Sequence, residues 1–489
     1  MEKGPSTPFS DSSTLNGGAS DDAVKNADMS VNTRGRVGGD GDAPSDEEEI
    51  KRRIRAADSK KERIYETARW LRQYRNIEVG EDGDIYAYDG AAGVWRGRYD
   101  NDDGMQTLRE RLYDTLRQDY DSNSLRSVIE HLKAQGRTEI DTFGTPSKTV
   151  AVKNGLLELH SGNLVKLQPE HRALWQMPVR YDPSADCPKF KAALKQWVPN
   201  KPTRKTLQEY VGSALDDSSV KFQKMLFLLG PTDTGKSVFL EVIERLFGEE
   251  HTASQSIQYL ANQRWGVDKI IGKPINVRHD LDTNVIKRTG MVKELASGNP
   301  MNAEAKHGDP YKARPTAKHF FSANQVPQRN SPDKAFYNRW LTVRFHQQIP
   351  EDDQNEDMED ELTTPDELSG ILNWAVKGYQ RLHEQGGFTK TRSPEETREL
   401  WRTYGDSIDQ FIVDWILKNP DSEVKKSKVY DEYVTYAKAQ GEPVENQQQV
   451  TSRLNRLDWV SEGQVRGSDS NPRVFRGIEL IGDMESDDE

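Results

Sequence analysis

The sequence contains few of the residues that mark secreted, zinc-binding or membrane proteins. Among 489 residues there is a single cysteine, Cys187, which excludes an internal disulfide and any zinc site built from several cysteines. No apolar run approaches the length of a membrane span, and the N-terminus lacks the apolar core of a signal peptide. We therefore expect a soluble, intracellular, cytoplasmic protein that makes no membrane contact.

Apolar residues are also scarce. Hydrophobic residues make up 34% of the chain and charged residues 30%, which is polar for a globular protein and indicates that part of it is unfolded. Residues 1–45, rich in Gly, Ser, Asp, Asn and Thr, are predicted to be a disordered tail, and residues 483–489 an acidic, solvated tail. The net charge of −12 argues against a histone-like binder but leaves room for a local basic channel.

One stretch has the pattern of a phosphate-binding loop. The apolar run 225–229 predicts a buried strand, and residues 238–247 predict an amphipathic helix. Between them, glycines allow a tight backbone turn whose N–H groups point at phosphate oxygens, and the helix N-terminus adds a positive dipole. In such a loop Lys236 would reach the β- and γ-phosphates of ATP, and Ser237 would bind Mg²⁺. The predicted nucleotide-binding residues are Gly230, Pro231, Thr232, Asp233, Thr234, Gly235, Lys236, Ser237 and Val238.

Acidic and polar residues follow two later strand-like runs. The run 273–278 leads to Asp280 and Asp282, and an acid at such a strand end can hold Mg²⁺ and polarise the attacking water. Asp280 is the first candidate, with Asp282 as the alternative, since spacing alone does not separate them. Asn324 ends the run 317–323 and could bind the γ-phosphate or the attacking water; the alternative is an Asn that caps a turn.

An arginine lies just before the last strand-like run of this region. Arg339 precedes residues 340–345, where a finger arginine supplied by a neighbouring subunit would fit; the alternative is a surface salt bridge. Since strand-like and helical runs alternate over residues 222–346, we expect a mostly parallel α/β sheet.

Together these motifs resemble superfamily 3 helicases, and most closely the phage/plasmid and poxvirus primase-helicase family. The resemblance rests on Gly230–Ser237, Asp280, the segment 293–308, Asn324 and Arg339, and it extends over about residues 60–480. It implies an AAA+-like P-loop ATPase, a homo-hexameric ring, ATP and Mg²⁺ as cofactors, and other replication proteins as further partners. The sequence departs from the family where neighbouring acids are usual, because it reads His279-Asp280-Leu281-Asp282. No primase module is visible.

Two segments are predicted to contact DNA. The turn at 308–310 is flanked by Lys306 and His307, and by position it resembles the family's channel-facing hairpin, so single-stranded DNA would lie there. Near the C-terminus, a polar helix carrying Arg453 and Arg456 precedes a basic hairpin, the outline of a winged helix that would contact duplex DNA. A solvated hairpin and a protein-contact domain are the respective alternatives.

The predicted architecture is α/β, with an N-terminal α+β domain and a C-terminal winged-helix-like domain around the ATPase core. The predicted boundaries are 46–185 for the N-terminal domain, 186–350 for the core, 351–366 for an acidic linker, 367–393 for a helical connector and 394–482 for the C-terminal domain. The predicted function is an ATP-dependent replicative DNA helicase of a virus or plasmid. A P-loop kinase, a monomeric nucleotide switch and a non-catalytic origin-binding protein are the alternatives.

Overall fold

A computed structural model describes residues 46–80, 83–97, 103–138, 144, 146–263, 265–282, 284–304, 310–330, 332–405, 407–439, 444–464 and 472–481. The chain divides into two compact units at Ile50, and everything below is described within the unit that begins there. The predicted tails 1–45 and 483–489 lie outside the described residues. Among the described helices, none combines the length and apolar composition that crossing a membrane requires.

The N-terminal region contains helices and small antiparallel sheets, as the sequence predicts. Its elements are α1 (Asp46–Ala56), α2 (Lys60–Tyr74), β1 (Ile77–Val79), β2 (Ile85–Asp89), β3 (Val94–Arg96), α3 (Asp103–Leu116), α4 (Ser122–Ala134), β4 (Thr149–Val152), β5 (Gly155–Glu158) and β6 (Leu164–Val165). β2 and β3 form a hairpin around Asp89-Gly90, with Asp89 opposite Val94. α1 and α2 are separate helices, because Ser59 caps α2 by accepting from the Glu62 N–H.

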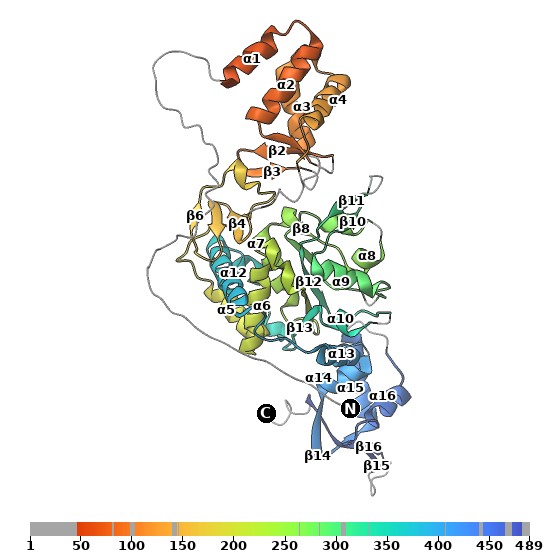
Figure 1. Cartoon of the computed structure of the whole chain (residues 1–489). Helices are drawn as coiled ribbons and strands as arrows, with labels where there is room; N and C mark the ends of the chain where they lie inside the picture. The colour runs from red at the N-terminus through yellow and green to blue at the C-terminus, as the bar shows by residue number, and fades with distance from the viewer. Residues whose placement is uncertain are drawn as a thin grey trace, which may run out of the picture. The chain divides into compact units, whose positions relative to one another are not determined.

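The centre of the chain is a five-stranded parallel sheet in the order β13-β7-β12-β9-β8 (Figure 1). Its strands are β7 (Met225–Leu229), β8 (Thr252–Ala253), β9 (Ile275–Arg278), β12 (Lys318–Ala323) and β13 (Trp340–Arg344). The predicted parallel sheet is therefore confirmed. All five residues of β7 are buried because both faces of the strand are covered, which explains its continuous apolar run.

Helices cover the two faces of this sheet (Figure 1). They are α5 (Pro188–Trp197), α6 (Lys201–Ser213), α7 (Lys236–Phe247), α8 (Ile257–Asn262), α9 (Thr289–Ser297), α10 (Lys334–Tyr337), α11 (Met358–Leu362), α12 (Pro365–Gln385) and α13 (Pro394–Thr403). Leu226 and Leu228 of β7 pack into the cluster that includes α5, α6, α7 and α12, whereas Phe227 packs into the cluster that includes α8, α9 and α13. This division follows from the alternation of side chains along a strand.

The segment predicted to be a linker and a connector is part of the core. Leu362 of α11 is 2% exposed, and Ile371 and Tyr379 of α12 are fully buried in the same cluster as α7. Thr364 caps α12 and Pro365 occupies its first turn, so the acids that follow lie at a favourable helix end. Acidic composition here indicates a helix start rather than an open linker.

The C-terminal region also begins later than predicted. Trp401 of α13 is buried against Trp340 of β13, with ring centroids 4.9 Å apart, so α13 belongs to the core. A separate apolar cluster starts at Ile408. It is formed by α14 (Ser407–Trp415), β14 (Ile416–Lys425), α15 (Lys426–Ala439), α16 (Gln447–Leu454), β15 (Ser461–Gln464) and β16 (Arg473–Leu480), with antiparallel strand order β14-β16-β15. The strand β14 was missed.

Candidate nucleotide site

The segment Gly230–Ser237, here called the candidate phosphate loop, joins the carboxyl end of β7 to the first turn of α7. Two of its glycines are fixed by close neighbours. A Cβ atom at Gly230 would lie 1.7 Å from the Phe345 carbonyl oxygen, and one at Gly235 would lie 2.3 Å from the Trp197 indole nitrogen. Gly235 also has a φ of 83°, which favours glycine. The tight backbone that phosphate binding requires is therefore present.

Lys236 lies inside this loop and is only 5% exposed. Its Nζ donates to the Gly230 carbonyl at 2.7 Å, to the Pro231 carbonyl, and to Thr234 Oγ1 at 3.4 Å. Burial lowers the pKa of Lys236 to about 8, and the carboxylates of Asp280 and Asp233 act in the opposite direction. A buried ammonium group with only neutral oxygens bonded to it is well suited to receive an anion.

The remaining loop residues divide into exposed and inward-facing ones. Thr232, Asp233 and Ser237 are exposed, so their side chains are accessible at the loop surface. Thr234 is buried and donates from its hydroxyl to the Pro231 carbonyl at 3.0 Å, which braces the turn. Val238 is half-buried and packs on the core below. Ser237, in the first turn of α7, thus presents a hydroxyl that is exposed and makes no hydrogen bond to the residues that the structure describes.

The acidic residues follow the carboxyl end of β9, on the same side of the sheet as the candidate phosphate loop. The Asp280 N–H donates to Ser322 Oγ at 3.3 Å, and the Leu281 N–H donates to the Ser322 carbonyl at 2.8 Å, which joins this turn to β12. Asp280 is exposed, adopts a φ of 42°, and acts electrostatically on Lys236. Asp282 is also exposed, and its carbonyl accepts a hydrogen bond from Gln258 at 2.7 Å. The geometry favours Asp280 as the acid facing the loop.

Asn324 follows β12, next to the candidate phosphate loop. The Gly230 N–H donates to the carbonyl of Ala323 at 3.3 Å, so the first residue of the loop contacts the residue before Asn324. The carbonyl of Asn324 accepts a hydrogen bond from Gln410 of α14 at 3.2 Å, and Gln410 is 1% exposed. Lys236, Asp280 and Asn324 therefore lie together beyond the carboxyl ends of β7, β9 and β12, because parallel strands end on the same side of a sheet.

Arg339 lies on the opposite side of the sheet, at the amino ends of β7 and β13. The Met225 N–H, at the start of β7, donates to the Arg339 carbonyl at 2.8 Å, whereas the loop follows the end of β7. Five strand residues span about 16 Å. The buried Nε of Arg339 has no hydrogen-bond partner among the described residues, and burial lowers the pKa of this side chain. The structure does not bring Arg339 to the loop of its own chain.

The predicted DNA-contacting residues have different outcomes. Lys306 and His307 lie outside the described residues; the strands on either side, β10 (Met301–Ala303) and β11 (Tyr311–Ala313), form an antiparallel pair. Arg456 is exposed. Arg453 is half-buried and forms an ion pair with Asp409 at 3.3 Å, which favours a structural role for it.

Several neighbours of the site were not predicted. Trp197 and Phe345 shape the loop, Gln410 holds the Asn324 backbone, and Lys224 lies beside Arg339. The pKa of Lys224 is lowered to about 8, first by burial and then by Arg339. These residues come from segments far apart in the chain, and their residue types alone carry no signal for this site.

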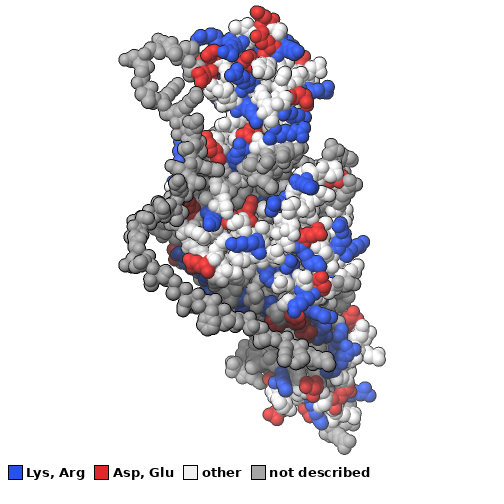
Figure 2. Space-filling model, in the orientation of Figure 1, with Lys and Arg blue, Asp and Glu red and all other residues white. Residues whose placement is uncertain are grey.

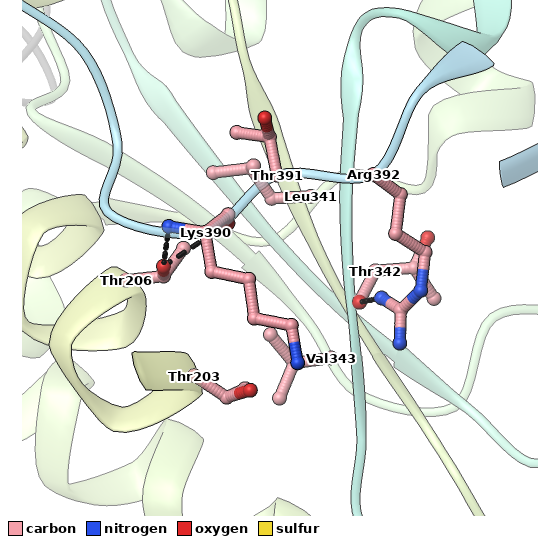
Figure 3. Close-up of a pocket in the computed structure, with 8 residues that line it drawn as sticks. All are labelled: Thr203, Thr206, Leu341, Thr342, Val343, Lys390, Thr391 and Arg392. Atoms are coloured by element: carbon pink, nitrogen blue, oxygen red, sulfur yellow. Dashed lines mark hydrogen bonds between the residues drawn. The ribbon is translucent and has the colours of Figure 1, made fainter. Parts of the chain in front are cut away.

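Away from the candidate phosphate loop, a small cavity lies beside the edge strand β13. It is too small for a nucleotide. Figure 3 shows Lys390 and Arg392 on either side of it, with Thr206 bonded to the backbone of Lys390 at 3.0 and 3.1 Å. Arg392 donates to the Thr342 carbonyl, which covers part of the free strand edge. The cavity volume is about 20 Å³, room for roughly one water molecule.

ATP and Mg²⁺ fit the residues at the candidate phosphate loop. Lys236 could bind phosphate oxygens, and the Ser237 hydroxyl and Asp280 carboxylate are the oxygen ligands that Mg²⁺ prefers. Within the described ranges no group of three or more His, Cys, Asp or Glu could hold a metal ion by itself.

Two family models match separate parts of the chain. Residues 47–199 match "D5 N terminal like", and residues 228–339 match a "Family of unknown function (DUF5906)". The second match begins within β7 and ends at Arg339, so it contains every predicted catalytic residue.

Two further proteins are similar to parts of the chain at low identity. It is 22% identical over 217 residues to "Putative helicase V13" of Sputnik virophage, which covers 39% of this chain and 27% of that protein. It is 24% identical over 164 residues to "Uncharacterized mitochondrial protein ymf21" of Marchantia polymorpha, covering 31% of this chain and 90% of that protein. The chain thus spans about a quarter of the length of the virophage protein. The D5-type match and the virophage relative support a relationship to the viral primase-helicase family.

The search of solved structures found the apo form of the NrS-1 C-terminal region. It is 8% identical, covers 85% of this chain and 98% of that one, and has a TM-score of 0.46; a second apo structure of the region gives 0.47.

Proposed function

We propose that this chain is a subunit of an ATP-dependent replicative DNA helicase of superfamily 3, which hydrolyses ATP with Mg²⁺ at the candidate phosphate loop. The support is the grouping of Lys236, Ser237, Asp280 and Asn324 at the carboxyl edge of one parallel sheet. Lys236 would bind the terminal phosphates, Ser237 and Asp280 the metal, and Asn324 the γ-phosphate or attacking water. The likeness to a protein named as a putative helicase supports the same class.

The observation that carries the proposal is the position of Arg339. It lies about 16 Å along the sheet from the loop of its own chain, at the start of β13. From this end of the sheet, Arg339 would serve the nucleotide of an adjacent subunit rather than the nucleotide of its own chain. A closed ring, which we propose to be a hexamer, supplies every loop with such an arginine.

DNA would bind at two places. The β10–β11 hairpin, with Lys306 and His307 in its connection, would contact a single strand in the central channel. The C-terminal elements follow the order helix, strand, two helices and two strands, which supports a winged helix, and Arg456 on the segment after α16 would contact duplex DNA. Because Arg453 is paired with Asp409, we assign DNA contact to Arg456 and a structural role to Arg453.

Two measurements test the proposal. The protein should displace a strand from a forked duplex, and DNA should stimulate its ATPase activity. A P-loop kinase or nucleotide switch would show no DNA stimulation, and a non-catalytic origin-binding protein would hydrolyse no ATP.

The shared site has its own test. Lys236→Ala and Arg339→Ala proteins should each be inactive, and mixing them should restore part of the ATPase activity, because some interfaces then combine an intact Lys236 with an intact Arg339. Absence of rescue at every mixing ratio would contradict the shared site.

A further inference from the structure

The stretch from Ile50 to Arg75, which follows the four acids at the start of α1, has a charge opposite to that of the whole chain. Between Ile50 and Arg75 there are ten Lys and Arg and three acids, a difference of +7, whereas the full chain carries −12. Figure 2 shows blue side chains spread over these helices, with acidic ones among them. This concentration lies outside every site described above.

One face of α2 carries cations and an aromatic ring in a regular row. Lys61, Tyr65 and Arg69 are all exposed and follow one another at four-residue intervals, which places them along one side of the helix. The other side of α2 is buried and includes Ile64, Ala68 and Leu71. Since a helix rises 1.5 Å per residue, the row is about 12 Å long. We call it the α2 row.

The ring at the centre of the row is accessible and has a second ring beside it. Tyr65 is 48% exposed, and its ring meets that of His131 of α4 edge-on, with centroids 5.7 Å apart. A tyrosine that served only to fill the core would be buried. Here the ring contacts α4 while about half of the residue stays exposed.

The two cations of the row are not neutralised within the described residues. Neighbouring Lys60 pairs with Asp121 at 2.7 Å, and Arg63 pairs with Asp119. By contrast, no hydrogen bond or ion pair engages Lys61 or Arg69 in the part of the chain that the structure describes. The helix therefore pairs some of its cations and keeps two free on the side of Tyr65.

Few acids oppose these cations. On α2, Glu62 is exposed, and Glu66 is half-buried with one carboxylate oxygen enclosed. On α4, the exposed Glu130 bonds Lys133 at 3.1 Å. The row thus presents two free positive charges on either side of an exposed ring.

We propose that the α2 row binds single-stranded nucleic acid, with Lys61 and Arg69 on backbone phosphates and Tyr65 stacked on a base. Cations that track the backbone and rings that stack on bases are the two elements of single-strand binding. A duplex keeps its bases stacked inside, so Tyr65 would contribute only to a single strand. This site needs neither the ring nor ATP hydrolysis and is additional to the contacts proposed above.

The test is fluorescence anisotropy of a labelled oligothymidine with the full chain, without nucleotide, over a series of salt concentrations. We expect Tyr65→Ala to lower affinity about tenfold and Tyr65→Phe to leave it unchanged, because phenylalanine keeps the stacking ring. Lys61→Ala and Arg69→Ala should each weaken binding and reduce the slope of log K against log salt by about 0.7. Lys60→Ala is the matched control, since it removes the same charge one residue away from a lysine that is already paired.

Three outcomes would overturn the proposal: a Tyr65→Ala affinity equal to wild type, an equal effect of Lys60→Ala and Lys61→Ala, or an equal loss of duplex binding in Tyr65→Ala. All these side chains are exposed, so unfolding temperatures should be unchanged. ATPase activity without DNA should also be unchanged. Failure of this proposal would therefore leave the proposed helicase function unaffected. Conversely, Lys236→Ala should lose ATPase activity and retain binding at the α2 row, which distinguishes the single-strand site from the ATPase site.

Discussion

The two ends of the central sheet have different chemistry. At the carboxyl end, the segments that carry Lys236, Asp280 and Asn324 are linked by hydrogen bonds, from the Gly230 N–H to the Ala323 carbonyl and from the Asp280 N–H to Ser322 Oγ. At the amino end, Arg339 and Lys224 lie together, and burial lowers the pKa of both. One end has the groups proposed to bind and orient a nucleotide; the other end has two cations and lies away from the candidate phosphate loop.

This difference is the one expected if, as proposed above, a single chain carries two halves of a site rather than one complete site. Two adjacent cations repel each other, and keeping them partly buried costs free energy. That cost is understandable if an anion from a neighbouring subunit approaches them. The predictions below are ordered by the size of the expected effect, and each tests whether the two ends depend on each other.

The largest effect should come from the amino end. Arg339→Ala should lower the ATP turnover rate by about 10³-fold while ATP binding persists, because the loop residues remain intact. Lys236→Ala should weaken binding itself. Steady-state ATPase assays and equilibrium binding of a fluorescent ATP analogue separate these effects.

A matched control for this prediction is Arg398→Ala, which removes an exposed arginine from α13. It should retain wild-type turnover. If Arg339→Ala weakened ATP binding as much as Lys236→Ala does, the two ends would not have the separate roles proposed.

The next effect distinguishes the two acids at the carboxyl end. Asp280→Asn should reduce ATP turnover by about 10²-fold, because its carboxylate acts on Lys236 and is proposed to hold the metal. Asp282→Asn should change turnover by less than about twofold, since surface substitutions away from a site have small effects. Turnover measured over a range of Mg²⁺ concentrations checks both; the reverse order would assign the metal to Asp282.

The features at the two ends of the sheet that depend on neighbouring residues in the chain were predicted well from the sequence. The strand β7, the loop and α7 form one continuous segment whose glycines, apolar run and helix end are all visible in order. Asp280, Asn324 and Arg339 each lie next to a strand end, so the positions of all three relative to strands followed from residue patterns. Parallel strands then determine which of them share an edge.

The parts that the sequence did not reveal depend on distant contacts. The short approach of Phe345 to Gly230 and of Trp197 to Gly235 joins segments that no local pattern connects. The acidic stretch before α12 was misread because Leu362 within it is buried and Thr364 caps a buried helix, and α13 was assigned to the wrong domain because Trp401 packs on β13. In each case tertiary packing decided what composition alone left open.

A smaller effect should come from the link between the carboxyl end and the C-terminal region. Asp414 of α14 accepts from Arg344 at 2.6 Å, from Tyr404 at 2.9 Å and from Tyr436 at 3.1 Å. Asp414→Ala leaves these donors without their acceptor and should lower the free energy of unfolding by about 2 kcal/mol. Urea denaturation followed by tryptophan fluorescence measures it, with Asp431→Ala, an exposed acid on α15, as the control expected to be neutral. Equal stability of the two variants would contradict the role of this link.

The smallest effect concerns the charge of Lys236 itself. Its pKa is lowered to about 8 in the folded chain, chiefly by burial, whereas in the unfolded chain it returns to about 10.4. Between these values the unfolded state binds more protons, so the free energy of unfolding should rise with pH, by about 1 kcal/mol from pH 8 to pH 9. Below pH 8 the lysine is protonated in both states and this dependence disappears.

Lys236→Met removes the titrating group, so the comparison with wild type isolates its contribution from those of Lys224 and other groups that both proteins share. The difference in unfolding free energy between the two proteins should therefore change between pH 8 and pH 9 and stay constant from pH 6 to pH 7. Saturating ATP should abolish the change in wild type, because phosphate charge stabilises the protonated lysine. An identical pH dependence in both proteins would show that Lys236 is not the buried cation of the loop.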